Sequence, residues 1–106
     1  MLSRPLGPRA KAALIDFVEA YVVSMKAGTV DETAEIAKEK AKAVLATDID
    51  ILSFAVTMGI FYSSPGVVLI SRVLSGQRTS REVATALVDL TEEIAYSIGR
   101  AFVYFL

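Results

Sequence analysis

The feature that most limits the fold is a long stretch without a charged residue, from Ile51 to Ser71. It is roughly as long as the 20 residues that a helix needs to cross a bilayer. A segment of this kind has to be buried in protein or in lipid. Pro65 interrupts the stretch, and proline removes a helical hydrogen bond. Pro65 should therefore kink the helix or split it in two, and we predict a helix over about 48–75 that is kinked at Pro65.

Helix start signals recur along the chain. Pro8 suits the first position of a helix, where its missing N–H would have no partner in any case. Capping patterns, in which a threonine precedes an acidic residue by three positions, occur at Thr29–Glu32, Thr47–Asp50 and Thr79–Glu82. We therefore predict an all-α fold in a single domain over 1–106. Its four helices lie at about 8–27, 30–46, 48–75 and 80–106, and the last two form an apolar helical hairpin.

The composition is too apolar for a chain of this size. Hydrophobic residues make up 54% of the 106 residues, against a norm of about 45–50% for globular domains. Small domains bury a smaller share of their surface than large ones, so a 106-residue monomer should be less apolar than average. We expect the surplus to be covered by lipid or by neighbouring subunits.

The residue inventory excludes most catalytic chemistry. The chain has no histidine and no cysteine, which removes the commonest general base, the commonest metal ligand and the thiol nucleophile. Acidic side chains share a helix face at Asp16 with Glu19, and at Asp89 with Glu92 and Glu93. They could bind a divalent cation or act as acid and base, but a polar stripe that faces water or a basic partner on the next subunit is favoured. We predict no enzyme activity, no catalytic residue, no metal and no cofactor.

Charge and composition also bear on partners and source. The net charge is −1, which argues against a dedicated nucleic-acid binder. Few amide residues together with many Glu, Lys and Arg fit a thermophilic source.

Aromatic and small residues on the apolar faces are candidates for packing between subunits. Gly59 and Gly99 each follow an alanine by four positions, a spacing that lets helix backbones approach closely. The full set of predicted packing residues is Phe17, Tyr21, Phe54, Gly59, Phe61, Ile94, Gly99, Phe102, Tyr104 and Phe105.

A basic turn links the two most apolar predicted helices. It contains Arg72, Arg78 and Arg81, and the segment from Arg72 to Arg81 has no acidic residue. It is either an ordinary solvated loop or, in an assembly, a surface that lines a lumen or meets phosphate groups. Many copies in register would add their weak electrostatic contacts together.

An apolar helical hairpin with a short basic turn resembles two kinds of assembly protein over roughly Asp48–Leu106. One is the conjugative pilin of type IV secretion systems, and the other is the helical coat protein of rod-shaped or spindle-shaped archaeal viruses. The resemblance implies a homopolymer, either an extracellular filament or a virion, with Arg72, Arg78 and Arg81 toward the lumen.

The chain also departs from the pilin pattern. It lacks a long signal peptide, and the last predicted helix carries Asp89, Glu92 and Glu93. Such charges are costly in a bilayer, which favours a coat protein or a soluble oligomer over a precursor stored in a membrane.

The leading hypothesis is a non-enzymatic structural subunit that self-assembles into a helical filament or shell. Lipid, or DNA bound without sequence specificity, would be its further partners. Two alternatives stay open: a small membrane-embedded helical protein, and a soluble helical-bundle subunit of a nucleic-acid complex.

Overall fold

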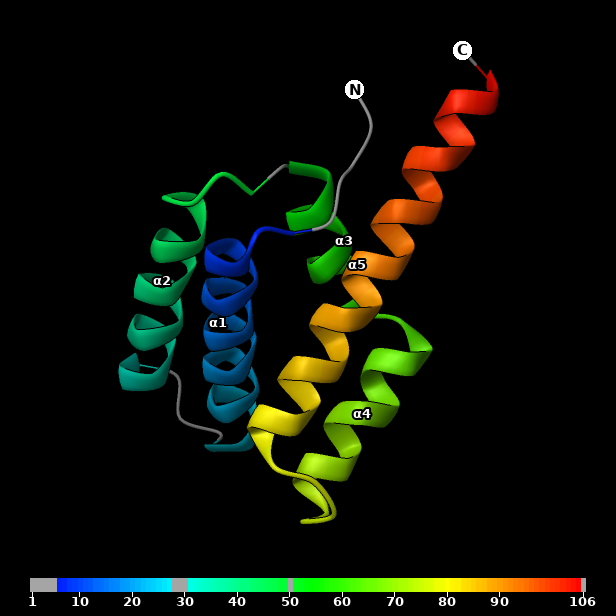
Figure 1. The fold of residues 1–106 in the computed structure, drawn as a ribbon. Helices are drawn as coiled ribbons and strands as arrows, with labels where there is room; N and C mark the ends of the chain where they lie inside the picture. The colour runs from blue at the N-terminus through cyan, green and yellow to red at the C-terminus, as the bar shows by residue number, and fades with distance from the viewer. Residues whose placement is uncertain (1–5, 28–30, 50, 106) are drawn as a thin grey trace.

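A computed structural model describes residues 6–27, 31–49 and 51–105, and within the helices it describes the side chains of residues 8–25, 35–45 and 52–98. Over these residues the chain is all-helical, with five helices (Figure 1). They are α1 (Pro8–Ala27), α2 (Asp31–Leu45), α3 (Ile51–Phe61), α4 (Ser64–Leu74) and α5 (Ser80–Phe105). The all-α class is confirmed, but the predicted count of four helices is wrong because the predicted 48–75 helix is two helices.

The break between α3 and α4 precedes Pro65. The two helix axes are bent by 61°, and Ser63 is the N-cap of α4, with its hydroxyl accepting from the Gly66 N–H at 3.4 Å. The same hydroxyl donates to the Ile60 carbonyl at 2.6 Å. Pro65 then lies in the first turn of α4, where a proline costs no helical hydrogen bond. The serine therefore ends one helix and starts the next, and the proline fits the new start.

Because of this break, the uncharged stretch does not form one continuous helix of the length that a membrane span needs. Among the described residues, no single helix is long and apolar enough to cross a bilayer. The bent pair formed by α3 and α4 meets the length and composition requirement when the two helices are taken together.

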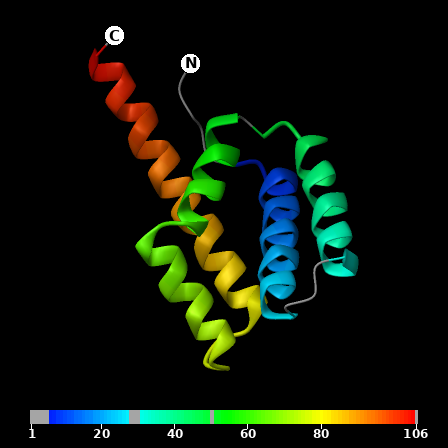
Figure 2. The ribbon, with the colours of Figure 1, turned by 180° about the vertical axis from the view of Figure 1, so that it is seen from behind.

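The helices form a bundle around α1 and α5 (Figures 1 and 2). α1 contacts α2 on one side and α5 on the other, while α3 and α4 both pack on α5. Among the described residues, α2 contacts α1 alone. The last turns of α5 extend past the other helices in both views.

The core lies where α1, α3, α4 and α5 meet. Its largest fully buried aliphatic side chains come mainly from α1 and α5, and α2 contributes Val44. The core side chains include Leu14, Val18, Val22, Val44, Ile60, Phe61, Ile70, Val73, Val83, Leu87 and Val88. Burying such side chains contributes about 1.5–3 kcal/mol each.

A polar contact inside this core was not anticipated from the sequence. The Thr57 hydroxyl on α3 lies 3.0 Å from the Thr91 hydroxyl on α5, and both side chains are buried. Each hydroxyl can also donate to its own helix, Thr57 to the Ser53 carbonyl at 2.9 Å and Thr91 to the Leu87 carbonyl at 3.0 Å. The two hydroxyls have one proton each, while three hydrogen bonds are possible. At most two of the three therefore form at the same time. The pair links α3 to α5 without an unpaired buried hydroxyl among the described residues.

The helix starts agree with the capping signals at some places and not at others. α1 begins at Pro8 as predicted. α3 begins at Ile51, later than predicted. The Thr47 hydroxyl donates to the Val44 carbonyl at 2.6 Å, and the cap that Thr47 was predicted to form with Asp50 lies outside the described residues. The predicted cap at Thr29 lies outside the described residues.

Candidate functional site

The turn between α4 and α5 is closed by two local motifs, one at each end. At the end of α4, Gly76 has φ +78°, a backbone conformation that glycine adopts without strain. The Gln77 N–H donates to the Arg72 carbonyl at 2.8 Å and the Gly76 N–H donates to the Val73 carbonyl at 3.1 Å. These two bonds form a Schellman motif, which ends α4 and fixes the direction of the turn.

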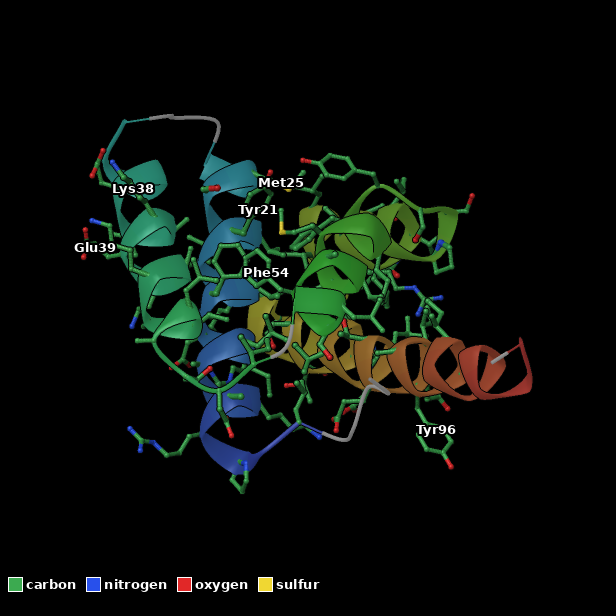
Figure 3. The ribbon with its side chains drawn as sticks, turned by 90° about the horizontal axis from the view of Figure 1, so that it is seen from above. Tyr21, Met25, Lys38, Glu39, Phe54 and Tyr96 are labelled. Atoms are coloured by element: carbon green, nitrogen blue, oxygen red, sulfur yellow. The ribbon has the colours of Figure 1, made fainter. Side chains whose placement is uncertain are left out.

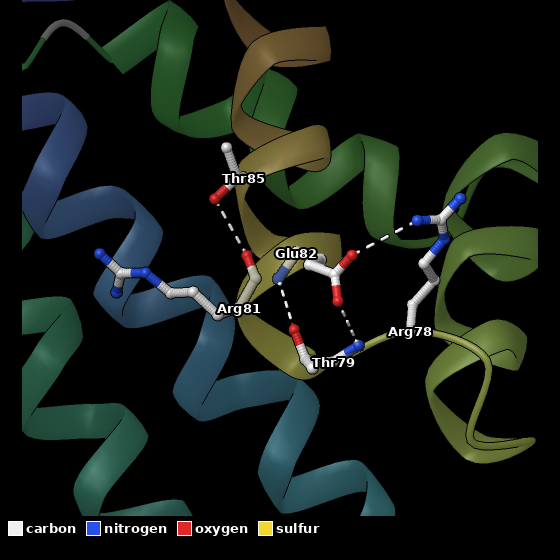
Figure 4. A network of polar contacts seen from close by, with 5 residues as sticks. All are labelled: Arg78, Thr79, Arg81, Glu82 and Thr85. Atoms are coloured by element: carbon white, nitrogen blue, oxygen red, sulfur yellow. Dashed lines mark hydrogen bonds and ion pairs between the residues drawn. The ribbon is translucent and has the colours of Figure 1, made fainter.

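At the start of α5, the predicted capping box is confirmed (Figure 4). The Glu82 N–H donates to the Thr79 hydroxyl at 3.1 Å, and the Thr79 N–H donates to Glu82 Oε1 at 3.2 Å. Arg78 Nη1 donates to Glu82 Oε2 at 3.3 Å. These hydrogen bonds, chiefly those with Thr79, lower the pKa of Glu82.

The lowered pKa predicts a specific dependence of stability on pH. A carboxylate whose pKa is depressed by folding contributes stability above its unfolded value, and the contribution is lost as pH falls through the folded value. We expect acid titration of the wild type below about pH 4.3, the ordinary glutamate value, to remove this contribution. In Glu82→Gln that part of the acid-induced loss should be missing when unfolding is followed by circular dichroism.

Glu93→Gln is the matched control, because Glu93 is on the same helix and has no hydrogen bond or ion pair with a described residue. It should keep the acid dependence of the wild type. An identical acid profile in Glu82→Gln and the wild type would contradict the role of the box.

The three arginines of the basic turn lie around one open groove between α4 and α5. Arg72, Arg78 and Arg81 line it together with Glu82 and Asp89. The structure therefore brings together the residues that were predicted to face a lumen or a phosphate group, but it places two carboxylates among them.

Two of these arginines are already paired within the chain. Arg81 Nη1 lies 2.6 Å from Asp16 Oδ1 and 3.8 Å from Glu19 Oε1 on α1, and the contact with Asp16 raises the pKa of Arg81. Arg78 is paired with Glu82. Arg72 forms no ion pair with a described residue, so of the three arginines in the turn it has the most freedom to meet an external anion.

A second ion cluster joins the other end of α1 to α5. Lys11 Nζ lies 2.8 Å from Glu92 Oε1 and 3.2 Å from Asp89 Oδ1. The hydrogen bonds with Glu92 and Asp89 raise the pKa of Lys11. Exposed pairs of this kind contribute about 0–1 kcal/mol each, so their main effect is to set how α1 and α5 align.

These pairs explain the acidic stripes noted in the sequence. Asp16 and Glu19 face Arg81, while Asp89 and Glu92 face Lys11, so the basic partner is in the same chain and not on another subunit. Within the described residues, no group of three or more acidic side chains is placed to hold a metal ion.

Four of the residues predicted to pack between subunits form an aromatic cluster inside the chain. Figure 3 shows two of them, Tyr21 and Phe54. The rings of Phe17 and Phe54 are stacked with centroids 5.9 Å apart, and those of Tyr21 and Phe61 are 4.7 Å apart. Phe17 and Phe61 are buried in the core. The core of the chain itself therefore covers these two rings, and their packing between subunits stays a prediction. Tyr21 and Phe54 are half-buried against the same core.

The outermost member of this cluster reaches the break between α3 and α4. The Tyr21 hydroxyl lies 3.1 Å from the Tyr62 hydroxyl, and this hydrogen bond raises the pKa of Tyr21, with a smaller effect from burial. The contact ties the end of α1 to the corner where the uncharged stretch bends.

The remaining predicted packing residues have different positions. Ile94 is exposed, and Gly59 is exposed with no atom within 4 Å of where a Cβ would lie. The surroundings of Gly99 and the side chains of Phe102, Tyr104 and Phe105 are outside what the structure describes. Packing between subunits stays a prediction for all six.

Other large apolar side chains are left on the surface. α4 exposes Val67 (57%), Val68 (49%) and Leu74 (56%), although the sequence did not single them out. The signal was present, because these residues alternate with Gly66, Ile70 and Val73 at helical spacing and cannot all face the core. Tyr96 on α5 also points away from the body of the molecule (Figure 3).

Comparison with known proteins adds no relative. No protein-family model matches the chain, and neither a curated protein nor a solved structure matches it.

Proposed function

We propose that the chain is a non-enzymatic structural subunit that self-assembles through apolar helix packing into a helical filament or shell, as a pilus or a virion coat. One observation carries the proposal. α4 leaves Val67, Val68 and Leu74 about half exposed to solvent. Exposed apolar patches of this kind mark contact surfaces in soluble proteins.

The basic turn would then face a lumen or a nucleic acid inside the assembly. Arg72 is the arginine that is free to do so, while Arg81 stays with Asp16 and Glu19. A single subunit would bind phosphate groups weakly, and the repetition of the subunit would supply the strength. The proposed place of the assembly is outside the cell, as a filament or virion of thermophilic archaeal origin.

The test is the size of the native material prepared without detergent. We expect long polymers or large particles in negative-stain micrographs and a large, broad mass distribution by light scattering. Val68→Glu places a charge on the exposed face of α4 and should shift the material to monomers or small oligomers. A monodisperse monomer of the unmodified chain would exclude the proposal.

Ala43→Glu is the matched control, because it places the same charge on an exposed position of α2, a helix that contacts α1 alone among the described residues. It should leave the particle size unchanged. Equal loss of assembly in both variants would mean that added negative charge, and not the α4 face, is responsible.

A second candidate function is a small membrane protein. It is favoured by the bent pair of α3 and α4, which together have the length and composition of a span. Against it, α3 packs on α5 through Thr57 and Thr91, and α5 carries acids that are costly to move into lipid. Carbonate washing of cell membranes distinguishes the two, because an inserted protein stays with the membrane fraction and an assembly subunit is released.

A further inference from the structure

We propose that two copies of the chain exchange their halves. One half is the hairpin of α1 and α2, and the other is the unit of α3, α4 and α5. In the exchange, α2 and α3 join into one straight helix, and α1 of each copy packs on α5 of the other. This inference rests on the proposed self-assembly, and it supplies the second contact that a polymer of this chain needs.

The two halves are held together through α1, since α2 contacts no other helix among the described residues. The contacts of α1 with the other half are specific. Asp16 Oδ1 lies 2.6 Å from Arg81 Nη1, and the rings of Phe17 and Phe54 stack with centroids 5.9 Å apart. Separated halves would expose the apolar core between them to water. A second copy offers every one of these partners, so the halves can pair within one chain or between two.

The connection between α2 and α3 is the one that can straighten. From Val30 to Met58 the sequence has no glycine and no proline. The other three connections between the described helices have such a residue in or beside them. Gly28 follows α1, Pro65 lies in the first turn of α4, and Gly76 ends α4 with φ +78°. A segment without either residue can continue as a helix.

The first residues after α2 already continue it. The Ala46 N–H donates to the Lys42 carbonyl at 3.0 Å, which is the pairing of an α-helix. The Thr47 hydroxyl donates to the Val44 carbonyl at 2.6 Å, a bond that threonine also makes inside helices. A helix that ran on through the turn would keep both bonds. It would extend from Asp31 to Phe61, a length of about 46 Å.

A straight helix would take α1 away from α5 of its own chain. Val44 is buried on α2, the helix that contacts α1 alone among the described residues. Thr57 on α3 contacts Thr91 on α5. Thr57 follows Val44 by 13 positions, which is about 3.6 turns of a helix. In one straight helix the two residues would therefore point to largely opposite sides, and each α1 would need α5 of the second copy.

The exchange explains how the exposed face of α4 can build a polymer. A single face that pairs with itself closes into a dimer and stops there. An exchanged dimer carries Val67, Val68 and Leu74 twice, once on each copy, so this face can bind neighbours in two directions. The exchange also places Phe17 against Phe54 of the second copy, and both were predicted from the sequence to pack between subunits.

Single engineered cysteines test the exchange, because the chain has no cysteine of its own. Asp16 and Arg81 are in contact and about half exposed. Chains with Asp16→Cys and chains with Arg81→Cys, refolded together at high concentration, should give covalent dimers with a short bis-maleimide. In the control mixture, Lys38→Cys on the exposed side of α2 replaces Asp16→Cys, and no such dimers should form.

The turn is tested by inserting two glycines after Asp48. Each glycine disfavours a helix about fivefold relative to alanine, so the yield of mixed dimers should fall by roughly tenfold or more. The same two glycines inserted after Gly28 are outside the connection between the halves. They should leave the yield unchanged.

Two results would overturn the inference. Absence of mixed dimers, in material that micrographs show to be polymeric, would reject the exchange and leave self-assembly through α4 standing. Equal yields with and without the glycines after Asp48 would mean that the chains meet without a straight helix of α2 and α3. Mixed dimers from chains that form no larger particles would support the exchange and reject the polymer, so the two proposals can fail separately.

Discussion

Gly66→Ala should destabilise the fold by about 2–3 kcal/mol, because it forces a methyl group into the corner between α3 and α4. A Cβ built on Gly66 would lie 1.9 Å from the Ile60 carbonyl oxygen. That oxygen also accepts hydrogen bonds from the Ser63 N–H at 3.0 Å and the Ser63 hydroxyl at 2.6 Å. The obstacle is backbone and cannot rotate away, so the corner has to open. The expected fall in Tm is roughly 10–20 °C for a chain of this size.

Gly59→Ala is the matched control, because Gly59 is within α3 and no atom lies within 4 Å of its Cβ position. Alanine is a better helix former than glycine by about 1 kcal/mol, so this variant should melt at an equal or higher temperature. Thermal unfolding by circular dichroism at several protein concentrations measures both variants and separates fold stability from assembly. Equal stability of Gly66→Ala and the wild type would mean that the corner is not closed as described.

Local signals in the sequence were reliable where the interacting groups are neighbours along the chain. The box at Thr79 and Glu82 needs two residues three positions apart, and it formed as predicted. In the similar pattern at Thr47, the hydroxyl donates to the Val44 carbonyl behind it, a contact within the preceding turn that the pattern did not predict. A threonine can close the preceding helix as readily as start the next one, and the pattern alone does not distinguish the two.

Contacts between distant segments explain what the sequence did not reveal. The acids at Asp16 and Glu19 were recognised as a stripe, but their partner Arg81 is on another helix, and its identity depends on how α1 and α5 align. The buried pair of Thr57 and Thr91 was missed for the same reason. Neither residue carries a charge, and each lies within a largely apolar helix. Their pairing could therefore not be recognised before the packing of α3 on α5 was known.

The excess of apolar residues predicted packing against other subunits or lipid, and that expectation stays a prediction. The sequence could not say which aromatic rings would be covered by the chain's own helices. The structure buries Phe17 and Phe61 and leaves Val67, Val68 and Leu74 exposed. Aromatic residues dominate cores as well as interfaces, so residue type alone cannot separate the two locations.

Phe61→Ala should cost about 3–5 kcal/mol of unfolding free energy, the usual range for removing a buried phenylalanine. Phe61 is 3% exposed at the end of α3. Its ring packs on Tyr21, with centroids 4.7 Å apart, so truncation leaves a cavity beside α1 at the corner where the chain bends. Chemical denaturation at low protein concentration measures the loss on the unassembled chain.

The adjacent residue provides the control. Tyr62 is 72% exposed, and Tyr62→Ala removes a hydrogen bond to Tyr21 that water can replace. It should change the unfolding free energy by less than about 1 kcal/mol. The two variants therefore separate core from surface at consecutive positions. If Phe61→Ala kept the stability of the wild type but prevented assembly, Phe61 would belong to a subunit contact after all. In that event the aromatic cluster would be an interface between subunits.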